Sequence, residues 1–380
     1  MDLPKTFKLE RYFAQYEFDN TKKLLCCSDA ESFDLKTLLS LGSSEDVEKW
    51  NNLKLCYTDS QGSLELRTEI SKLQDINPEN ILVCVPAEGI FIALTCLAKE
   101  LKGKKAIVCW PCYQSLIEVL ESNGVTTDKW LARYSSEKGW YFDMNELRGL
   151  IKDNVGLVVV NFPHNPTSFL PSTDEFNELI KLCKENDIYL FSDEMYRMTE
   201  RSIPHLSSAC SVYDKAISLS GLSKSFGLPG LRVGWLCCQN DEILGKFKGL
   251  KDYLTICSSS PTEALGVIAL KNRDALTTTI QLIIKKNLSL VSALAVKYQE
   301  LIEWHEPKAG TTGFMKLREK LLKGRTATDV CAELVDKFNI VLLPAKTYQY
   351  EDKYVRFGFA RKDMEILLTD FDNFLSQYAN

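Results

Sequence analysis

Histidine is scarce in this chain, as are long apolar runs and blocks of one charge. The three histidines among the 380 residues are far apart along the sequence: His164, His205 and His305. The thirteen cysteines are scattered, and the adjacent pairs Cys26-Cys27 and Cys237-Cys238 lack the spacing of metal ligands. We therefore predict neither a structural nor a catalytic metal site.

No apolar run approaches the roughly 18 to 20 residues of a membrane-spanning helix, and no signal-like segment opens the chain. The 46 basic and 51 acidic side chains give a net charge of −5 without a basic block, which disfavours nucleic acid and anionic membranes as partners. Scattered cysteines inside apolar runs are typical of reduced, buried thiols. We expect a cytoplasmic protein that acts on small molecules.

Short apolar runs alternate with helical patterns through the first two thirds of the chain. The predicted strands are 81–85, 106–110, 157–162, 188–192, 216–222 and 233–238, and the predicted helices between them include 90–99, 115–123 and 174–186. Strands buried on both faces and separated by helices predict an α/β fold, with a mostly parallel sheet sandwiched by helices. Ligand-binding residues are expected at the carboxyl ends of such strands.

The last hundred residues have a different pattern. A long helical pattern at 277–304 is followed by strand patterns at 313–317, 341–343 and 354–359. This change predicts a second, smaller α+β domain.

One segment, from Ser223 to Trp235, places a lysine eight residues before an arginine in a glycine-rich turn after the run 216–222. The amine of Lys224 can form an imine with a carbonyl cofactor, and Arg232 can hold the phosphate of that cofactor. An isolated pair of this kind would equally fit two solvated charges. Given the rest of the chain, we interpret the segment as an anchor for pyridoxal phosphate.

Polar residues follow two more of the predicted strands. Asp193 ends the run 188–192, where a buried carboxylate could keep a pyridine nitrogen protonated, and Tyr196 could bind the phenolate oxygen of the same ring. Asn165, in the turn after 157–162, precedes a proline and could direct its amide at that oxygen. Ordinary loop residues and turn capping are the alternative explanation for all three.

Two strand ends add an anion site and an aromatic face. The segment Pro86-Ala87-Glu88 follows the strand 81–85 and begins a helix, so its free N–H groups and the helix dipole favour an anion. Tyr113 follows the strand 106–110, and its ring could stack on a flat heterocycle or pack in the core.

From about Leu9 to the C-terminus, these motifs resemble those of class I/II aminotransferases, in the fold-type-I pyridoxal phosphate family. The resemblance implies that Lys224 holds the cofactor and then moves a proton between the substrate α-carbon and the cofactor. It also implies that Asp193 pairs with the pyridine nitrogen and that Tyr196 and Asn165 bind the ring oxygen.

The same resemblance implies how the rest of the cofactor is held. Tyr113 would stack on the ring, and Arg232 would hold the phosphate together with the backbone of residues 86–88. The family often carries a phosphate-binding serine three residues before the lysine, whereas this chain has Gly221 there. Ser220 and Ser223 are nearby, and the sequence leaves open which hydroxyl contacts the phosphate.

The resemblance further implies a homodimer whose active site is shared between subunits. Tyr57 is similar to the family tyrosine that reaches a phosphate in the neighbouring subunit. Arg356 resembles the arginine that binds the α-carboxylate of an amino acid by a two-pronged contact, with Asn165 also at the substrate; a solvated strand arginine is the alternative. The implied architecture is a large cofactor-binding domain of residues 43–276 and a small domain of residues 1–42 and 277–380.

The predicted reaction is transfer of an amino group from an L-amino acid to a 2-oxo acid. Elimination, side-chain cyclisation and racemisation start from the same chemistry, and a non-catalytic protein that binds the cofactor or an amino acid is a further alternative. The segment 161–166 is similar to relatives that cyclise an arginine derivative, over too short a stretch to transfer that activity. Candidates for lining the substrate pocket are Glu88, Thr311, Thr312, Phe314 and Tyr348.

Overall fold

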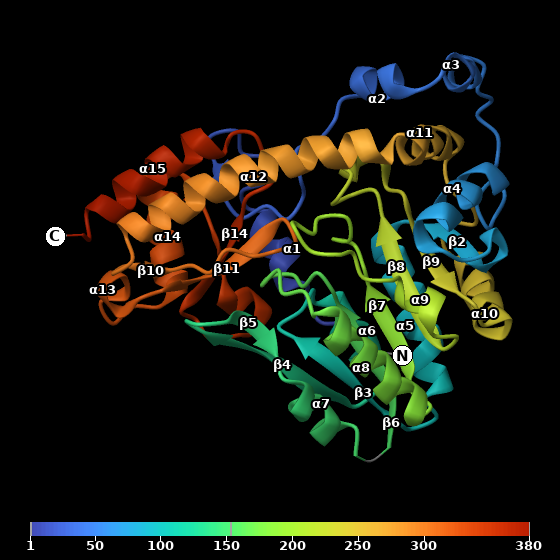
Figure 1. The fold of residues 1–380 in the computed structure, drawn as a ribbon, viewed down its shortest axis with the longest axis horizontal. Helices are drawn as coiled ribbons and strands as arrows, with labels where there is room; N and C mark the ends of the chain where they lie inside the picture. The colour runs from blue at the N-terminus through green and yellow to red at the C-terminus, as the bar shows by residue number, and fades with distance from the viewer. Residues whose placement is uncertain (1, 153, 380) are drawn as a thin grey trace.

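The computed structural model describes residues 2–152 and 154–379 (Figure 1). Its larger sheet has eight strands in the order β2-β9-β8-β7-β6-β3-β4-β5. The five strands from β8 to β4 are parallel, while β9 and β5 run antiparallel to their neighbours. In sheet order the strands are β2 (Ile81–Cys84), β9 (Gly234–Cys238), β8 (Ala216–Gly221), β7 (Tyr189–Asp193), β6 (Val155–Asn161), β3 (Lys105–Trp110), β4 (Thr127–Ser135) and β5 (Gly139–Phe142). The predicted α/β fold with a mostly parallel sheet is confirmed.

The strands found from the sequence are the ones buried on both faces. Every residue of β6 and β8 is buried, so these strands are continuous apolar runs. The hairpin of β4 and β5 was missed because β4 lies near the sheet edge, where polar residues such as Asp128, Lys129 and Arg133 interrupt its apolar pattern.

Helices cover both faces of this sheet (Figure 1). The chain steps in one direction from β2 through β3 to β4 and in the opposite direction from β6 through β7 to β8, so right-handed crossovers place the connecting helices on opposite faces. One face carries α5 (Pro86–Glu100), α6 (Ser115–Ser122) and α10 (Asp241–Lys251); the other carries α7 (Met144–Leu150), α8 (Thr173–Glu185) and α9 (Ala209–Val212). The three predicted helices are α5, α6 and α8.

A further group of helices packs at the β2 side of the sheet. Alternate residues of β2 separate two core clusters, with Leu82 and Cys84 facing α5 and Ile81 and Val83 facing the other side. The second cluster is completed by α4 (Leu64–Gln74) and α11 (Ser260–Lys271), next to which lie α2 (Leu35–Leu41) and α3 (Ser44–Asn51).

The C-terminal part contains a smaller antiparallel sheet in the order β10-β11-β14-β13. A separate two-stranded pairing of β1 (Lys23–Leu24) with β12 (Ile340–Val341) brings the N-terminal segment to this part. The elements of this part include β10 (Ile302–Glu303), β11 (Thr312–Leu317), β13 (Leu343–Pro344), β14 (Tyr354–Gly358), α13 (Glu319–Leu322), α14 (Ala327–Phe338) and α15 (Met364–Ser376). The division into domains 43–276 and 1–42 with 277–380 stays a prediction, and residues 1, 153 and 380 lie outside the described residues.

The long helix α12 (Arg273–Lys297) connects the two parts and ends before the predicted residue 304. By length and composition alone it could cross a membrane, contrary to the expectation that no such segment exists. Its buried residues, such as Ile280, Ile284, Leu288 and Val291, recur every three or four positions and face the small-sheet core. This one-sided pattern is typical of a core helix, so the evidence for a membrane span is weak.

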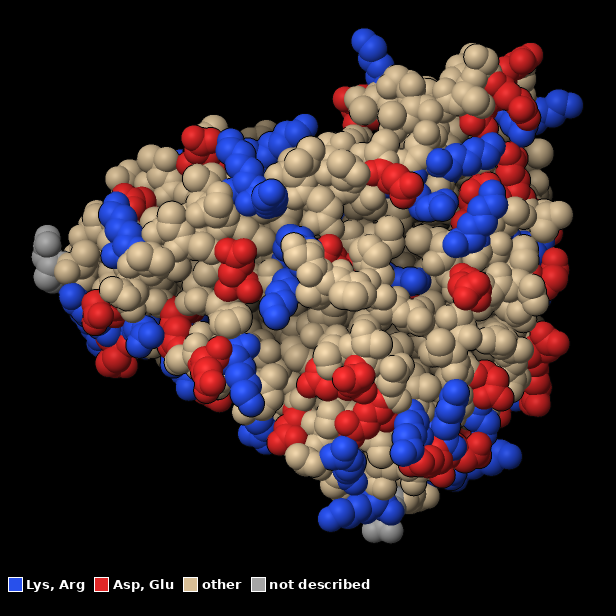
Figure 2. Space-filling model, viewed as in Figure 1, with Lys and Arg blue, Asp and Glu red and all other residues tan. Residues whose placement is uncertain are grey.

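Charges of both signs are interspersed over the face of the molecule shown in Figure 2. The distribution agrees with the small net charge of −5. On this face, the surface has no broad area of a single sign.

Candidate active site

A cavity of about 500 Å³ lies at the carboxyl ends of the central strands. Because β3, β6, β7 and β8 are neighbours in the sheet, the loops that follow them converge at one edge. The predicted site residues that line this cavity are Pro86, Ala87, Tyr113, Asn165, Asp193, Tyr196, Ser223, Lys224, Arg232 and Arg356. A second cavity of about 470 Å³, between the 167–173 and 305–308 segments, contains none of them.

Lys224 lies in the loop after β8, with its amine directed at the N-terminal segment. Its Nζ donates a hydrogen bond to Ser28 Oγ at 3.0 Å. Burial lowers the pKa of Lys224, although the nearby Asp29 carboxylate opposes this effect. A lowered pKa increases the share of neutral amine near neutral pH, and the neutral amine is the form that acts as nucleophile and base.

Asp193 is the last residue of β7 and is buried. Its Oδ1 accepts a hydrogen bond from the N–H of Met195 at 3.1 Å, and its carbonyl accepts one from Asn161 Nδ2 at 3.0 Å. Burial raises the pKa of Asp193 to about 7. A protonated pyridine nitrogen beside this carboxylate would offset the cost of burying its charge.

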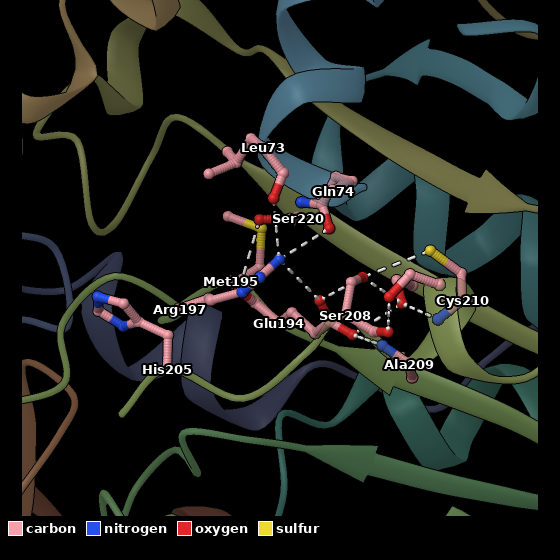
Figure 3. Close-up of polar contacts among 12 residues, drawn as sticks. Leu73, Gln74, Glu194, Met195, Arg197, His205, Ser208, Ala209, Cys210 and Ser220 are labelled. Carbon is pink, nitrogen blue, oxygen red and sulfur yellow. Dashed lines mark hydrogen bonds and ion pairs between the residues drawn. The ribbon is translucent and has the colours of Figure 1, made fainter. Parts of the chain in front are cut away.

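The adjacent carboxylate, Glu194, is held by a separate hydrogen-bond network just after the end of β7 (Figure 3). It accepts hydrogen bonds from Ser208 Oγ at 2.9 Å, from the N–H of Ala209 at 2.9 Å and from Ser218 Oγ at 2.7 Å. These contacts fix the end of β7 to α9 and β8. Burial has the largest effect on the pKa of Asp193, and the hydrogen bond from Met195 has the next largest. The negative charge of Glu194 also raises this pKa, by a smaller amount.

Tyr196 and Tyr113 provide phenol groups at the cavity. Tyr196 is buried, and burial raises its pKa to about 12. The hydroxyl therefore stays protonated at neutral pH and can donate a hydrogen bond. The hydroxyl of Tyr113 donates to Glu10 Oε1 at 3.3 Å, and its ring lies 5.0 Å from that of Phe7.

Arg356 reaches the cavity from β14 in the smaller sheet and is 2% exposed. Its Nη1 donates to Tyr348 Oη at 2.7 Å and to Asn165 Oδ1 at 3.3 Å, and its Nε donates to the carbonyl of Cys26 at 2.9 Å. Tyr348 also donates to Asn165 Oδ1 at 3.2 Å. The guanidinium is thus fixed by the protein at one end of the cavity, where it can bind a carboxylate.

The cavity lining also has the features of a phosphate site. Ser223 lines it and its buried Oγ has no hydrogen-bond partner within the described chain, whereas Ser220 Oγ donates to the Glu194 carbonyl at 3.4 Å and lies outside the lining. A Cβ on Gly221 would lie 2.8 Å from the Val233 carbonyl oxygen, which explains why a serine does not fit there. The structure therefore favours Ser223 over Ser220 as the phosphate-binding hydroxyl.

Other predicted residues lie outside the cavity lining: Tyr57, Glu88, Thr311, Thr312, Phe314 and Tyr348. Tyr57 is 87% exposed. The side chain of Glu88 accepts hydrogen bonds from Thr255 Oγ1 at 2.7 Å and from the Val85 N–H at 3.3 Å, which leaves only its backbone, in the first turn of α5, for the predicted contact. Arg232 is exposed at the cavity edge and donates to the Pro229 carbonyl at 2.9 Å.

The N-terminal segment supplies lining residues that the sequence analysis missed. Helix α1 (Lys8–Phe13) and the residues around it contribute Leu9, Glu10, Phe13, Glu17, Cys27, Ser28 and Asp29, and Arg361 follows from the other end of the chain. Asp29 pairs with Arg361 at 2.8 Å. Burial raises the pKa of the Cys27 thiol to about 12, so this thiol is not a ready nucleophile. No local motif marks these residues, because they meet the site only through tertiary packing.

These groups fit a phosphorylated pyridine aldehyde. The cavity offers an amine for the aldehyde, a buried carboxylate for the ring nitrogen, and a free hydroxyl beside a helix start for the phosphate. Arg356, in the same lining, can bind the carboxylate of a substrate.

Comparison with known proteins agrees with this geometry. Residues 49–369 match the model of the family "Aminotransferase class I and II". Capreomycidine synthase of Streptomyces vinaceus is 27% identical over 84% of this chain and 81% of its own length. A PLP-dependent aminotransferase from Streptococcus suis is 26% identical with a TM-score of 0.88, over 100% of both chains. The PLP-dependent cyclase OrfR, at 22% identity, has the same fold, with a TM-score of 0.90 over 100% of this chain and 99% of its own.

The family match covers most of the chain, and the fold and the chemistry of the cavity agree with it. Pyridoxal 5'-phosphate is the cofactor of these enzymes. The chain belongs to the class I and II aminotransferase family and is a pyridoxal phosphate-dependent enzyme.

Proposed function

We propose that the enzyme transfers an amino group from an L-amino acid to a 2-oxo acid. The observation that carries this proposal is the shared cavity of Lys224, Asp193 and Arg356. When bound, pyridoxal phosphate supplies an electron sink that acidifies the α-proton of an amino acid. The remaining requirements are a base near the α-carbon, a carboxylate site and a fixed cofactor.

Each of these requirements has a candidate residue. Arg356 holds the substrate carboxylate, which places the α-carbon towards Lys224. Lys224, whose pKa is lowered by burial, takes the proton from the substrate α-carbon. It would then deliver this proton to the carbon of the cofactor's aldehyde group. Asp193 keeps the pyridine nitrogen protonated, while Ser223 and the first turn of α5 hold the phosphate.

The proposal is tested by the two halves of the reaction. The yellow holoenzyme is mixed with single amino acids, and the cofactor absorbance is followed. An amino-group transferase should bleach with its donor and regain its colour with a 2-oxo acid. Mass spectrometry of the products should then show a 2-oxo acid formed from the donor; bleaching without recovery would contradict transfer.

A second candidate is another outcome at the same centre, such as cyclisation, elimination or racemisation. It is favoured by the 27% identity to capreomycidine synthase, a relative that is not named as an aminotransferase. In the same experiment this candidate predicts a cyclic product, ammonia or the D-amino acid. A protein that binds the cofactor and reacts with no amino acid would be a binding protein.

A homodimer is part of the proposal, with Tyr57 donated to the phosphate site of the partner. Tyr57 lies in a segment tied to residues 258–260 by hydrogen bonds from Thr58 Oγ1 to the Ser258 carbonyl and from Ser260 Oγ to the Lys54 carbonyl. The exposed apolar side chains in these two segments and just before the second one are Leu55, Tyr57, Tyr253, Leu254 and Ile256. Thr255 contacts Glu88 at the start of α5, so this apolar surface adjoins the predicted phosphate site.

The dimer has its own test. Light scattering should give twice the monomer mass of 43.2 kDa, and Tyr57→Phe should weaken cofactor binding while the dimer persists. A monomer that binds the cofactor tightly would contradict this part of the proposal.

We propose a cytoplasmic location on the basis of the cysteines. All thirteen are free thiols, and most are buried, as is usual in a reducing compartment. Cell fractionation checks this, and recovery in a membrane or secreted fraction would contradict it.

A further inference from the structure

The charges that line the cavity do not balance once the cofactor and an amino acid are placed. The lining has eight charged side chains: Glu10, Glu17, Asp29, Asp193, Lys224, Arg232, Arg356 and Arg361. Asp29 and Arg361 neutralise each other as an ion pair. Under the proposed function, on which this inference rests, Asp193 serves the ring nitrogen, Lys224 the aldehyde, Arg232 the phosphate and Arg356 the carboxylate.

Two acidic side chains, Glu10 and Glu17, are left over. Within residues 2–152 and 154–379, neither has a Lys, Arg or His nitrogen within the 4.0 Å of an ion pair. Glu10 is half-buried, and among the described residues its side chain accepts one hydrogen bond, from Tyr113. Glu17 is exposed at the edge of the cavity. A carboxylate at the cavity that has no cation beside it can form a charge-assisted hydrogen bond with a cationic ligand.

Helix α1 holds Glu10 in a fixed place beside the reacting groups. The backbone N–H of Lys8 donates to Gln114 Oε1 at 2.9 Å, and Gln114 Nε2 returns a hydrogen bond to the Thr6 carbonyl at 3.0 Å. On the other side of the helix, Tyr12 Oη donates to the Leu342 carbonyl at 2.7 Å. The helix is thus anchored to both parts of the molecule.

Glu10 lies close to other groups of the site. Its partner, Tyr113, is the predicted stacking residue, and Phe13, one turn further along α1, lies 5.4 Å from the guanidinium of Arg356. Glu10 is also close enough to Lys224 to raise the pKa of that amine, against the larger effect of burial. A substrate fixed between Arg356 and Lys224 therefore has α1 beside it.

We infer that the enzyme selects amino acids with a cationic side chain, and that Glu10 binds the ammonium or guanidinium group. Glu17, at the edge of the same cavity, adds negative charge along the approach of such a substrate. Acidic substrates are disfavoured, because a second carboxylate would lie against two uncompensated carboxylates.

Binding of isosteric amino acids tests this inference directly. L-Arginine and L-citrulline have nearly the same shape but differ in side-chain charge, and L-ornithine and L-norleucine form a second pair. Calorimetry on the holoenzyme should give at least about tenfold tighter binding of the cationic member of a pair, because a hydrogen bond between charged groups is worth that much. This preference should weaken with rising salt.

The variant Glu10→Gln should lower the affinity for L-arginine about tenfold more than that for L-citrulline. Because the ratio is measured within one protein, partial unfolding does not change it. The matched control is Glu48→Gln. Glu48 is exposed on α3 and lies outside the cavity lining, so this variant should leave the ratio unchanged.

The outcomes separate the two proposals. If the neutral amino acids or L-glutamate bind as tightly as L-arginine, or if Glu10→Gln keeps the wild-type ratio, the inference is wrong while the proposed function stands. If no amino acid binds or changes the cofactor absorbance, the proposed function fails and the inference fails with it.

Discussion

Arg356 Nη1 donates a hydrogen bond to Asn165 Oδ1 across 3.3 Å, which joins β14 of the smaller sheet to the loop after β6 of the larger one. Both residues also contact Tyr348 Oη. The substrate carboxylate site is therefore built from both parts of the molecule, and its geometry depends on how the two parts pack.

Replacement of Arg356 by alanine should weaken substrate binding without loss of the cofactor. Loss of a charge-assisted contact predicts a rise of about 10- to 100-fold in the KM for the amino acid. Arg356→Lys should give an intermediate value, because lysine keeps the charge but lacks the planar fork. Steady-state kinetics checks both variants, with cofactor absorbance as the control; an unchanged KM would remove Arg356 from the substrate site.

Gly221 should not tolerate a side chain, even the serine that the family often has there. A Cβ at this position would lie 2.8 Å from the Val233 carbonyl oxygen and 3.1 Å from Pro86 Cγ. Gly221→Ser should therefore destabilise the protein by about 1–3 kcal/mol and loosen cofactor binding. Gly230→Ala is the control, because its Cβ would meet nothing within 4 Å. Urea unfolding measures both, and equal stability of the two variants would contradict the packing argument.

Asp193 should make the stability of the cofactor-free protein depend on pH. Its folded-state pKa is raised from 3.8 to about 7, so between about pH 4 and pH 7 the folded state keeps a proton that the unfolded state has lost. Stability should therefore fall as the pH rises through this window, by at most about 1.4 kcal/mol per unit.

The variant Asp193→Asn isolates this contribution, because the amide does not titrate. Between pH 5 and pH 7 the unfolding free energy of the wild type should fall further than that of the variant. Identical pH profiles for the two proteins would mean that Asp193 ionises normally.

Lys224→Ala should leave a folded protein with very slow turnover. Loss of proton transfer alone predicts a decrease of about 10²- to 10⁴-fold in kcat, with near-wild-type circular dichroism and thermal stability. A kcat close to that of the wild type would show that another residue is the base.

The sequence predicted the parts of the fold that local patterns encode. The six strands of the larger sheet that are buried along all or nearly all of their length were found, since apolar runs bounded by turns mark them. Strand β4 was missed because most of its residues are exposed or half-exposed and mixed in polarity. Its hairpin partner β5 is only four residues long, although most of it is buried. The predicted strand at 341–343 is divided into β12 and β13, which pair with different partners.

The site residues also fall into those that could be predicted from the sequence and those that could not. Residues next to strand ends, such as Asp193 and Lys224, could be predicted because the sheet fixes where those ends meet. Ser28 and Glu10 could not, because they lie almost two hundred or more residues before Lys224 and reach the cavity through the packing of α1 and the N-terminal segment. Sequence spacing carries no signal for such contacts.

The most direct test of the central claim is to locate the cofactor on the chain. The holoenzyme is reduced with borohydride, digested and mapped by mass spectrometry. A phosphopyridoxyl group on Lys224, and on no other lysine, is the predicted result. A label on a different lysine, or an unlabelled protein after reduction of a fully loaded sample, would contradict the assignment of Lys224 and of the roles arranged around it.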